Sequence, residues 1–140
     1  MPRKLRTDDP TIDSTNTADP VQRVRAVAMQ LPQTTERLSH GEPTFFINDK
    51  KTFVMTVNDH HGDGILGMWI PAPTGEQESL ISENPRVYFR PPYVGHRGWV
   101  GVRLDTDPVL DQQTLVELIH QAWSEVAPKK LLAAFEEPKS

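Results

Sequence analysis

The sequence predicts an α+β fold: a two-layer sandwich in which an antiparallel sheet of about five strands is covered on one face by helices from both ends of the chain. Three observations support this prediction. Apolar residues recur at helical spacing near each end, they alternate with period two in between, and the breaks between strands are short and rich in Gly, Asn, Asp and Pro. A chain of 140 residues has the length of one domain.

Both ends of the chain are polar. The first 19 residues show neither helical nor strand periodicity, so we expect a flexible tail at 1–19, one domain over 20–135 and a short tail at 136–140. The chain has no cysteine, no secretory signal after its basic start and no apolar run long enough to span a membrane. This combination predicts a soluble cytoplasmic protein.

The first half of the domain predicts one helix and three strands. Asp19 before Pro20 is an N-cap signal, and helical spacing continues to about Leu31. Residues 44–47 and 52–57 flank a polar turn and predict a β-hairpin, in whose second arm Phe53, Met55 and Val57 share one face. A further strand is expected at 65–70.

The second half predicts a short helix at about 77–81, strands at 86–90 and 99–104, and a final long helix. The loop between these two strands is rich in Pro and Gly. Asp111 is a candidate N-cap for the last helix, whose apolar stripe ends near Val126, and Pro128 opens a short last turn. Trp123 is expected in the core.

The segment from Arg86 to Arg103 gives the strongest indication of function. It contains four arginines, one histidine and four aromatic residues without an acidic side chain, although the whole chain has a formal net charge of -4. This acidic balance argues against nucleic-acid binding through overall charge and leaves only local binding.

Strand alternation predicts which of these side chains reach the surface. In 99–104, Val100, Val102 and Leu104 should face the helices, and in 86–90 Val87 and Phe89 should do the same. The opposite face, which would also carry Trp69 beside Gly67, can hold phosphates through arginine and stack planar groups on aromatic rings. Counting the adjoining loop, the candidate binding residues are Arg86, Tyr88, Arg90, Tyr93, Arg97, Trp99 and Arg103. The same pattern also occurs on ordinary solvent faces, where arginine stems cover apolar sheet surface.

Two weaker clusters carry groups capable of chemistry. His60 and His61 lie among carboxylates in a glycine-rich turn, but this composition also suits the turn itself, and we assign no metal site. His40 and Glu42 could form an acid/base pair, yet no orienting group or nucleophile is spaced to assist them. Nucleotide-binding and hydrolase motifs are absent, so we assign no catalytic residue and no cofactor.

Taken together, residues 20–135 resemble the MmcQ/YjbR family of small bacterial proteins. The resemblance lies in the order and spacing of Leu31, Pro32, Glu36, His40, Gly41, Pro43, Phe45, Lys51 and Phe53, followed by Tyr93, Val94, Gly95, Gly98, Trp99, Val100, Val102 and Leu104, and then Trp123, Ala127, Pro128, Lys129 and Leu131. It implies a compact α+β sandwich similar to that of secretion chaperones, and a DNA-binding label, without catalytic residues. The acidic balance and the polar N-terminal tail depart from a general DNA-binding pattern.

These observations favour a non-enzymatic binding module, with DNA as the phosphate-bearing partner of the arginine and aromatic face. The alternative is a protein or peptide docking surface on the same face. A third hypothesis is an enzyme or small-ligand site around His40, Glu42 and His96. The sequence is compatible with a monomer or a homodimer.

Overall fold

The computed structural model describes residues 19–136, so the tails predicted at 1–19 and 136–140 lie almost entirely outside the described residues. The strands are β1 (Thr34–Ser39), β2 (Glu42–Ile47), β3 (Lys51–Asn58), β4 (Leu66–Ile70), β5 (Tyr88–Phe89) and β6 (Val100–Arg103). The helices are α2 (Pro20–Ala28), α3 (Glu76–Glu83), α4 (Gln112–Val126) and α5 (Lys129–Glu136), with 3-10 turns η2 (His60–Gly62) and η3 (Gly95–Arg97).

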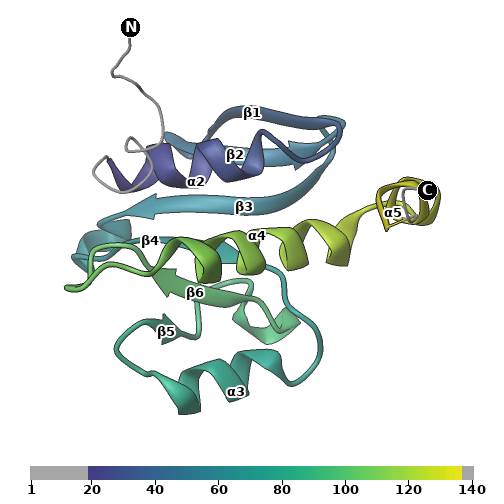
Figure 1. Ribbon diagram of the computed structural model, residues 1–140. Coiled ribbons are helices and arrows are strands. Elements are labelled where there is room, and N and C mark those ends of the chain that lie inside the picture. Colours follow the sequence, from purple (N-terminus) through teal and green to yellow (C-terminus); the bar gives the residue numbers. More distant parts are fainter. Residues whose placement is uncertain (1–18, 137–140) are drawn as a thin grey trace, which may run out of the picture.

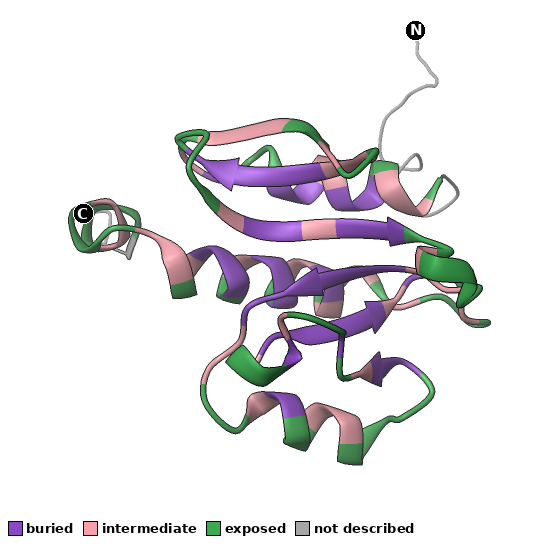
Figure 2. Ribbon diagram, turned by 180° about the vertical axis from the view of Figure 1, so that it is seen from behind, coloured by how far each residue is buried: buried purple, intermediate pink, exposed green. Residues whose placement is uncertain are grey.

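The six strands form one antiparallel sheet in the order β1-β2-β3-β4-β6-β5. Helices α2 and α4 lie side by side on one face of it, and α3 lies near the β5 edge (Figure 1). Seen from behind, no described helix crosses β2, β3 or β4 (Figure 2). The predicted α+β sandwich is therefore confirmed, with six strands in place of five. None of the described helices is both long and apolar enough to cross a membrane.

The elements differ from the sequence prediction in three main respects: one strand was not predicted, the first helix is shorter, and one strand is shorter. Strand β1 was not predicted, because an edge strand of sequence TTERLS carries no apolar alternation. The first helix ends at Ala28, and Leu31 is buried in the turn that follows it. Strand β5 contains only two residues, since the backbone N–H groups of Val87 and Tyr88 both donate to the Asn84 carbonyl and form a turn there.

A register shift in the β2–β3 hairpin changes which residues of β3 face the helices. The irregularity lies between Phe45 and Phe46, so Phe45 pairs with Val54 while Phe46 pairs with Thr52. As a result Phe53 and Val54 both join the main core, whereas Met55 belongs to the opposite face. The prediction that Phe53 shares a face with Met55 and Val57 was wrong for this reason.

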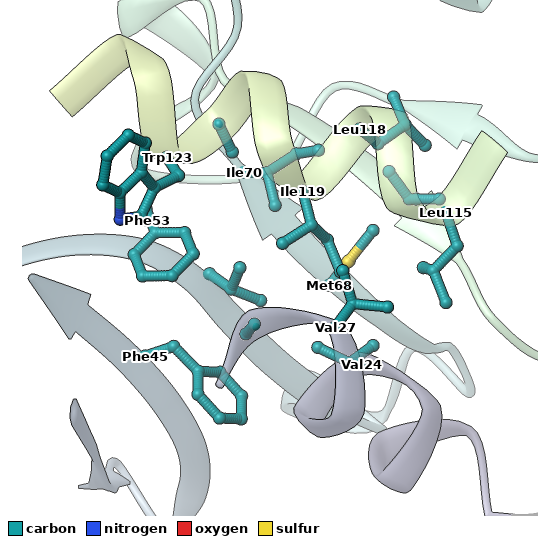
Figure 3. Close-up of a cluster of buried hydrophobic side chains, with 14 of the residues drawn as sticks. Val24, Val27, Phe45, Phe53, Met68, Ile70, Leu115, Leu118, Ile119 and Trp123 are labelled. Carbon is teal, nitrogen blue, oxygen red and sulfur yellow. The ribbon is translucent and has the colours of Figure 1, made fainter. Parts of the chain in front are cut away.

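The main core lies between the sheet and helices α2 and α4, where Trp123 is the largest completely buried side chain (Figure 3). Its neighbours in the cluster include Phe45 and Phe53 from the hairpin. The Trp123 indole Nε1–H donates to the Pro32 carbonyl at 3.2 Å, which joins α4 to the turn after α2. Trp123 therefore stabilises the domain through both packing and a polar contact.

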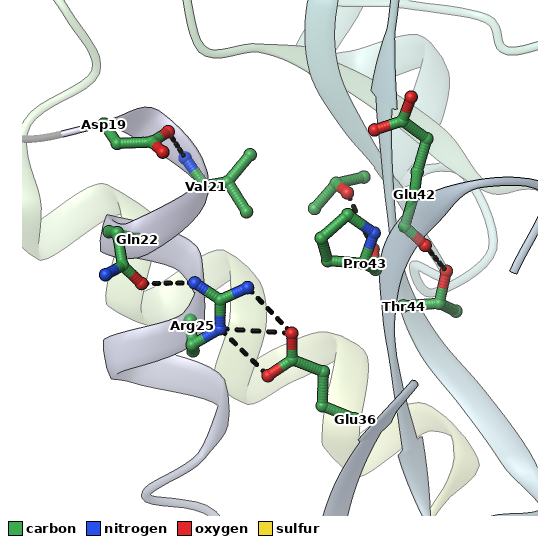
Figure 4. Close-up of polar contacts among 9 residues, drawn as sticks. Asp19, Val21, Gln22, Arg25, Glu36, Glu42, Pro43 and Thr44 are labelled. Carbon is green, nitrogen blue, oxygen red and sulfur yellow. Dashed lines mark hydrogen bonds and ion pairs between the residues drawn. The ribbon is translucent and has the colours of Figure 1, made fainter. Parts of the chain in front are cut away.

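An ion pair joins α2 to the edge strand β1. The Arg25 guanidinium donates to both carboxylate oxygens of Glu36, with distances of 2.7 to 3.1 Å (Figure 4). The hydrogen bond to Glu36 raises the pKa of Arg25. Because both side chains are partly exposed, the pair is worth at most about 1 kcal/mol, and its main effect is to orient β1.

We predict that Trp123→Ala lowers the free energy of unfolding by about 3–5 kcal/mol, because it removes a fully buried aromatic side chain and leaves a cavity. Trp123→Phe should lose less, since it keeps part of the packing and loses the bond to Pro32. Urea unfolding measures both changes. Glu125→Ala on the exposed side of α4 is the control, and a Trp123→Ala effect as small as that of the control would contradict the prediction.

A second prediction concerns acid sensitivity. Asp111 caps α4 by accepting from the Thr114 hydroxyl and backbone N–H, and these hydrogen bonds lower its pKa below 3.8. A carboxylate with a lowered pKa in the folded state stabilises the fold above its unfolded pKa, and this contribution is lost as the pH falls through the folded value. Asn keeps the cap but does not titrate. Urea midpoints should therefore fall less between about pH 5 and 2 for Asp111→Asn than for the wild type, whereas Glu125→Gln should follow the wild type.

Candidate functional site

The sheet face opposite the helices carries a second, smaller apolar cluster. Val57, Trp69 and Trp99 are its buried members, and Met55, Phe89 and Val94 pack against them. Glycine makes this packing possible, because a Cβ at Gly101 would lie 2.3 Å from the Phe89 ring. We call this side of the sheet the outer face.

The outer face is hollowed beside this cluster by a pocket of about 610 Å³, which is within the range of small-ligand sites. Its floor is apolar and is supplied by β3, β4 and the loop after β5. Its rim is polar and comes from the β1–β2 turn, the η2 loop and Tyr93. The lining residues are Ser39, His40, Glu42, Thr44, Met55, Thr56, Val57, Asn58, His60, His61, Trp69, Tyr93 and Val94. We call this the outer-face pocket.

The rim residues have an unusual backbone. His40, His61 and Tyr93 have φ values of 53°, 49° and 65°, in the left-handed region that non-glycine residues rarely adopt. They are three of the seven such residues in the described chain, and a fourth, Asp59, directly precedes His60. His40 and Gly41 form the two-residue turn between β1 and β2, which requires positive φ at both positions. The left-handed conformations of His61 and Tyr93 lie in longer loops and are of the kind that clusters at functional sites.

Contacts between aromatic groups join the two loops at the rim. The His61 Nε2 atom and the Tyr93 hydroxyl are 3.2 Å apart, although Tyr93 is 66% exposed. The His60 ring meets Trp69 and Tyr93 edge-on, with centroids 5.1 and 5.8 Å away. Together these contacts close the loop of η2 over Trp69.

Two polar atoms beneath this closure have no hydrogen-bond partner among the described residues. They are Nε2 of His60 and Nε1 of Trp69, and both are sealed from solvent. A buried polar atom without a partner costs about 1–3 kcal/mol.

The two aspartates of the η2 loop accept hydrogen bonds from backbone N–H groups of the same loop and so stabilise its turn. Asp59 Oδ1 accepts from the Gly64 N–H at 2.7 Å, and Asp63 Oδ1 accepts from the Ile65 N–H at 2.9 Å. Within residues 19–136, no three side chains of the metal-binding types come together. The arrangement of this loop therefore gives no support to a metal centre.

The structure corrects the predicted orientation of the short strand β5. Tyr88 pairs with Val102 and lies in the main core, while Phe89 lies on the outer face over Gly101. The predicted inward and outward alternation of side chains begins at Arg86. In the structure, the turn at Asn84 means that the strand begins only at Tyr88. Burial, and to a smaller extent the charge of Glu83, raises the pKa of Tyr88 above 10.0. Tyr88 is therefore not available for stacking.

The remaining candidates are dispersed. Trp99 is on the outer face as predicted, but it is buried, with the Arg97 guanidinium 5.3 Å from its ring centroid. Arg103 pairs with Asp105 at 3.2 Å, and Arg86 is exposed in the turn before β5. Tyr93 alone among the seven lines the outer-face pocket.

Arg90 and Arg97 both line a shallow depression of about 270 Å³ beside the start of α3. His96 lines the same depression, so it is separate from His40 and Glu42, which it was predicted to accompany. Gln77 holds the loop here by donating to the carbonyls of Gly95 and Trp99 at 2.9 and 2.5 Å. Arg90 in turn donates to Gln77 Oε1 at 3.3 Å.

Sequence reasoning missed the convergence of His40, His60, His61 and Tyr93. In the sequence these residues fall in two separate histidine clusters and in the basic segment. The sequence did indicate that each of these residues lies in a turn. Gly41 follows His40, glycines follow His61, and two prolines precede Tyr93, and all of these are turn-forming residues. Such residues indicate where turns occur in the sequence, but they do not indicate which turns lie close together in the folded protein.

Comparisons with known proteins agree with this fold. The crystal structure of Deinococcus radiodurans protein DR2400, with family-model domain DUF419, is similar with a TM-score of 0.64 and 20% sequence identity, over 87% of this chain and 94% of that one. At this identity the likeness establishes the fold alone. No curated protein matches the chain. The YjbR family model matches residues 29–125, which is more than half of the chain, and the protein therefore belongs to the YjbR family.

Proposed function

We propose that this protein is a non-enzymatic binding module whose ligand has an apolar body and enters the outer-face pocket. The pocket itself carries the proposal, because its size and its apolar floor below a polar rim are those of small-ligand sites. The left-handed backbone at His61 and Tyr93 adds support, because such conformations cluster at functional sites.

The proposal does not include catalysis. The His61 and Tyr93 side chains touch, but neither contacts a carboxylate that would orient the histidine, among the hydrogen bonds of the described residues. A general base normally needs such a third group. Binding therefore requires fewer assumptions than a reaction.

The first test uses 2-phenylethanol, a neutral compound with an apolar ring and one hydroxyl. We expect it to shift the backbone amide signals of Met55 and Val57 and the Trp69 indole signal in ¹H–¹⁵N spectra, with a Kd of about 1–10 mM for so small a ligand. Ser39→Trp should abolish these shifts, because Ser39 lines the pocket. Its neighbour Leu38 is 68% exposed and lies outside the pocket, so Leu38→Trp is the matched control. Equal binding by both variants, or no binding by the wild type, would refute the proposal.

A second candidate function is DNA binding at the depression that contains Arg90 and Arg97. Its support is that two guanidinium groups and His96 line one concave surface, and that neither arginine forms an ion pair within the described residues. Glu78 lines the same surface and weakens this attraction. Phosphate contacts by arginine give affinity that falls with salt.

For this candidate, we predict that an Arg90→Ala/Arg97→Ala double variant binds a single-stranded 12-mer at least about five-fold more weakly at low salt, with a salt slope reduced by about 1–2. Fluorescence anisotropy at several salt concentrations gives both values. The double variant Lys50→Ala/Lys51→Ala changes the net charge equally on the exposed hairpin turn and should bind normally. Absence of binding at low salt, or equal loss in the two double variants, would exclude the depression as the site.

A further inference from the structure

We propose that the ligand of the outer-face pocket is an organic ammonium ion, in which a cationic amine is attached to an apolar or aromatic body. This inference rests on the proposed function, and it specifies the charge of the ligand. It follows from the charges and aromatic rings of the pocket.

Among the described residues 19–136, Glu42 is the only formally charged residue in the pocket lining when imidazoles are counted as neutral, and none of these lining residues is a lysine or arginine. The Glu42 backbone carbonyl accepts from Thr44 Oγ1 at 3.0 Å, while its carboxylate extends away from that contact (Figure 4). No basic side chain of residues 19–136 forms an ion pair with it. Glu42 lines the pocket, and we infer that its carboxylate pairs with the cation.

The described arginines of the outer face and its edges make other contacts and do not line the pocket. Arg37 pairs with Asp49 and stacks on Phe46, with its guanidinium carbon 3.8 Å from the ring centroid. Arg103 pairs with Asp105, and Arg97 stacks on Trp99. The next charged side chains along the η2 loop are Asp59 and Asp63, which add further negative charge near the rim. Arg97 keeps its positive charge, but it lines the depression beside α3 and not the outer-face pocket, so Glu42 supplies the formal charge of the described pocket lining.

Aromatic side chains add to this preference. Trp69 and Tyr93 both line the pocket, and the faces of such rings attract a cation by about 0.5–2 kcal/mol, depending on how far it is desolvated. Met55 and Val57 offer apolar surface for the rest of the ligand. An anion would instead face Glu42 without any counter-charge from a lysine or arginine.

Three compounds with one aromatic body and different charges test this inference: 2-phenylethylamine, 2-phenylethanol and 3-phenylpropionate, measured by ¹H–¹⁵N titration at pH 8 and low salt. We expect the amine to bind about 5- to 30-fold more tightly than the alcohol, and the carboxylate to bind most weakly. Glu42→Gln should reduce the affinity for the amine toward that for the alcohol and leave the affinity for the alcohol unchanged. Glu125→Gln on the other side of the domain changes net charge equally and should have no effect.

The outcomes separate the inference from the proposed function. If the alcohol binds at the pocket but the amine binds no better, or if Glu42→Gln affects both equally, the ammonium inference is wrong and the pocket remains a binding site. If none of the three compounds binds, both are wrong.

A free arylalkylamine and the side chain of a lysine in a partner protein present the same ammonium chemistry. Nα-acetyl-lysine N-methylamide distinguishes them within the same titration. Binding within about three-fold of 2-phenylethylamine supports ammonium recognition with lysine as the source, because an alkyl stem then suffices. Binding of the arylalkylamine alone supports it with a free aromatic amine as the source.

Discussion

The apolar layer between the sheet and helices α2 and α4 is the interaction on which the rest of this structure depends. Trp123, Phe45 and Phe53 are completely buried in it, and it fixes the curvature and register of the central strands. Every feature of the outer face stands on the reverse side of these strands. The floor of the pocket is rigid because the other side of β3 and β4 is close-packed, and close-packed interiors have low compressibility.

Because all the covering helices lie on one face, the outer face has to bury its own apolar residues by other means. Near β5 and β6 it does so with a loop: Phe89 fits over Gly101, Trp99 is buried, and Gln77 on α3 holds the loop by two carbonyls. Toward β2 and β3 no such cover comes from residues 19–136, and this part of the surface is hollow between the η2 loop and the β1–β2 turn. The pocket is thus the part of the outer face that the loop does not reach.

Strand alternation predicted the sheet well where strands are long and failed where they are short. In β4 and β6, Met68, Val100 and Val102 face the main core and Trp69 faces outward, as period two requires. In β5 a turn shifted the count by one residue, and in β3 a bulge did the same, and a shift of one residue reverses every side chain. The pocket could not be predicted from periodicity, because its rim is made of turn residues whose positive φ values aim their side chains. Their convergence depends on how three loops meet in space.

The YjbR family match covers both the floor and the rim of the outer-face pocket. The matched range, residues 29–125, includes every lining residue, but a shared fold specifies the strands that supply Met55, Val57 and Trp69, and it leaves loop sequences free. DR2400, at 20% identity, shares the arrangement of the chain, and that degree of identity leaves the side chains at the rim open. His40 and the η2 histidines lie in turns and Glu42 is the first residue of β2, so the charge of a ligand depends on residues in or next to turns. The strands supply the apolar part of the outer-face pocket, and the residues in and beside these turns supply its polar and charged groups.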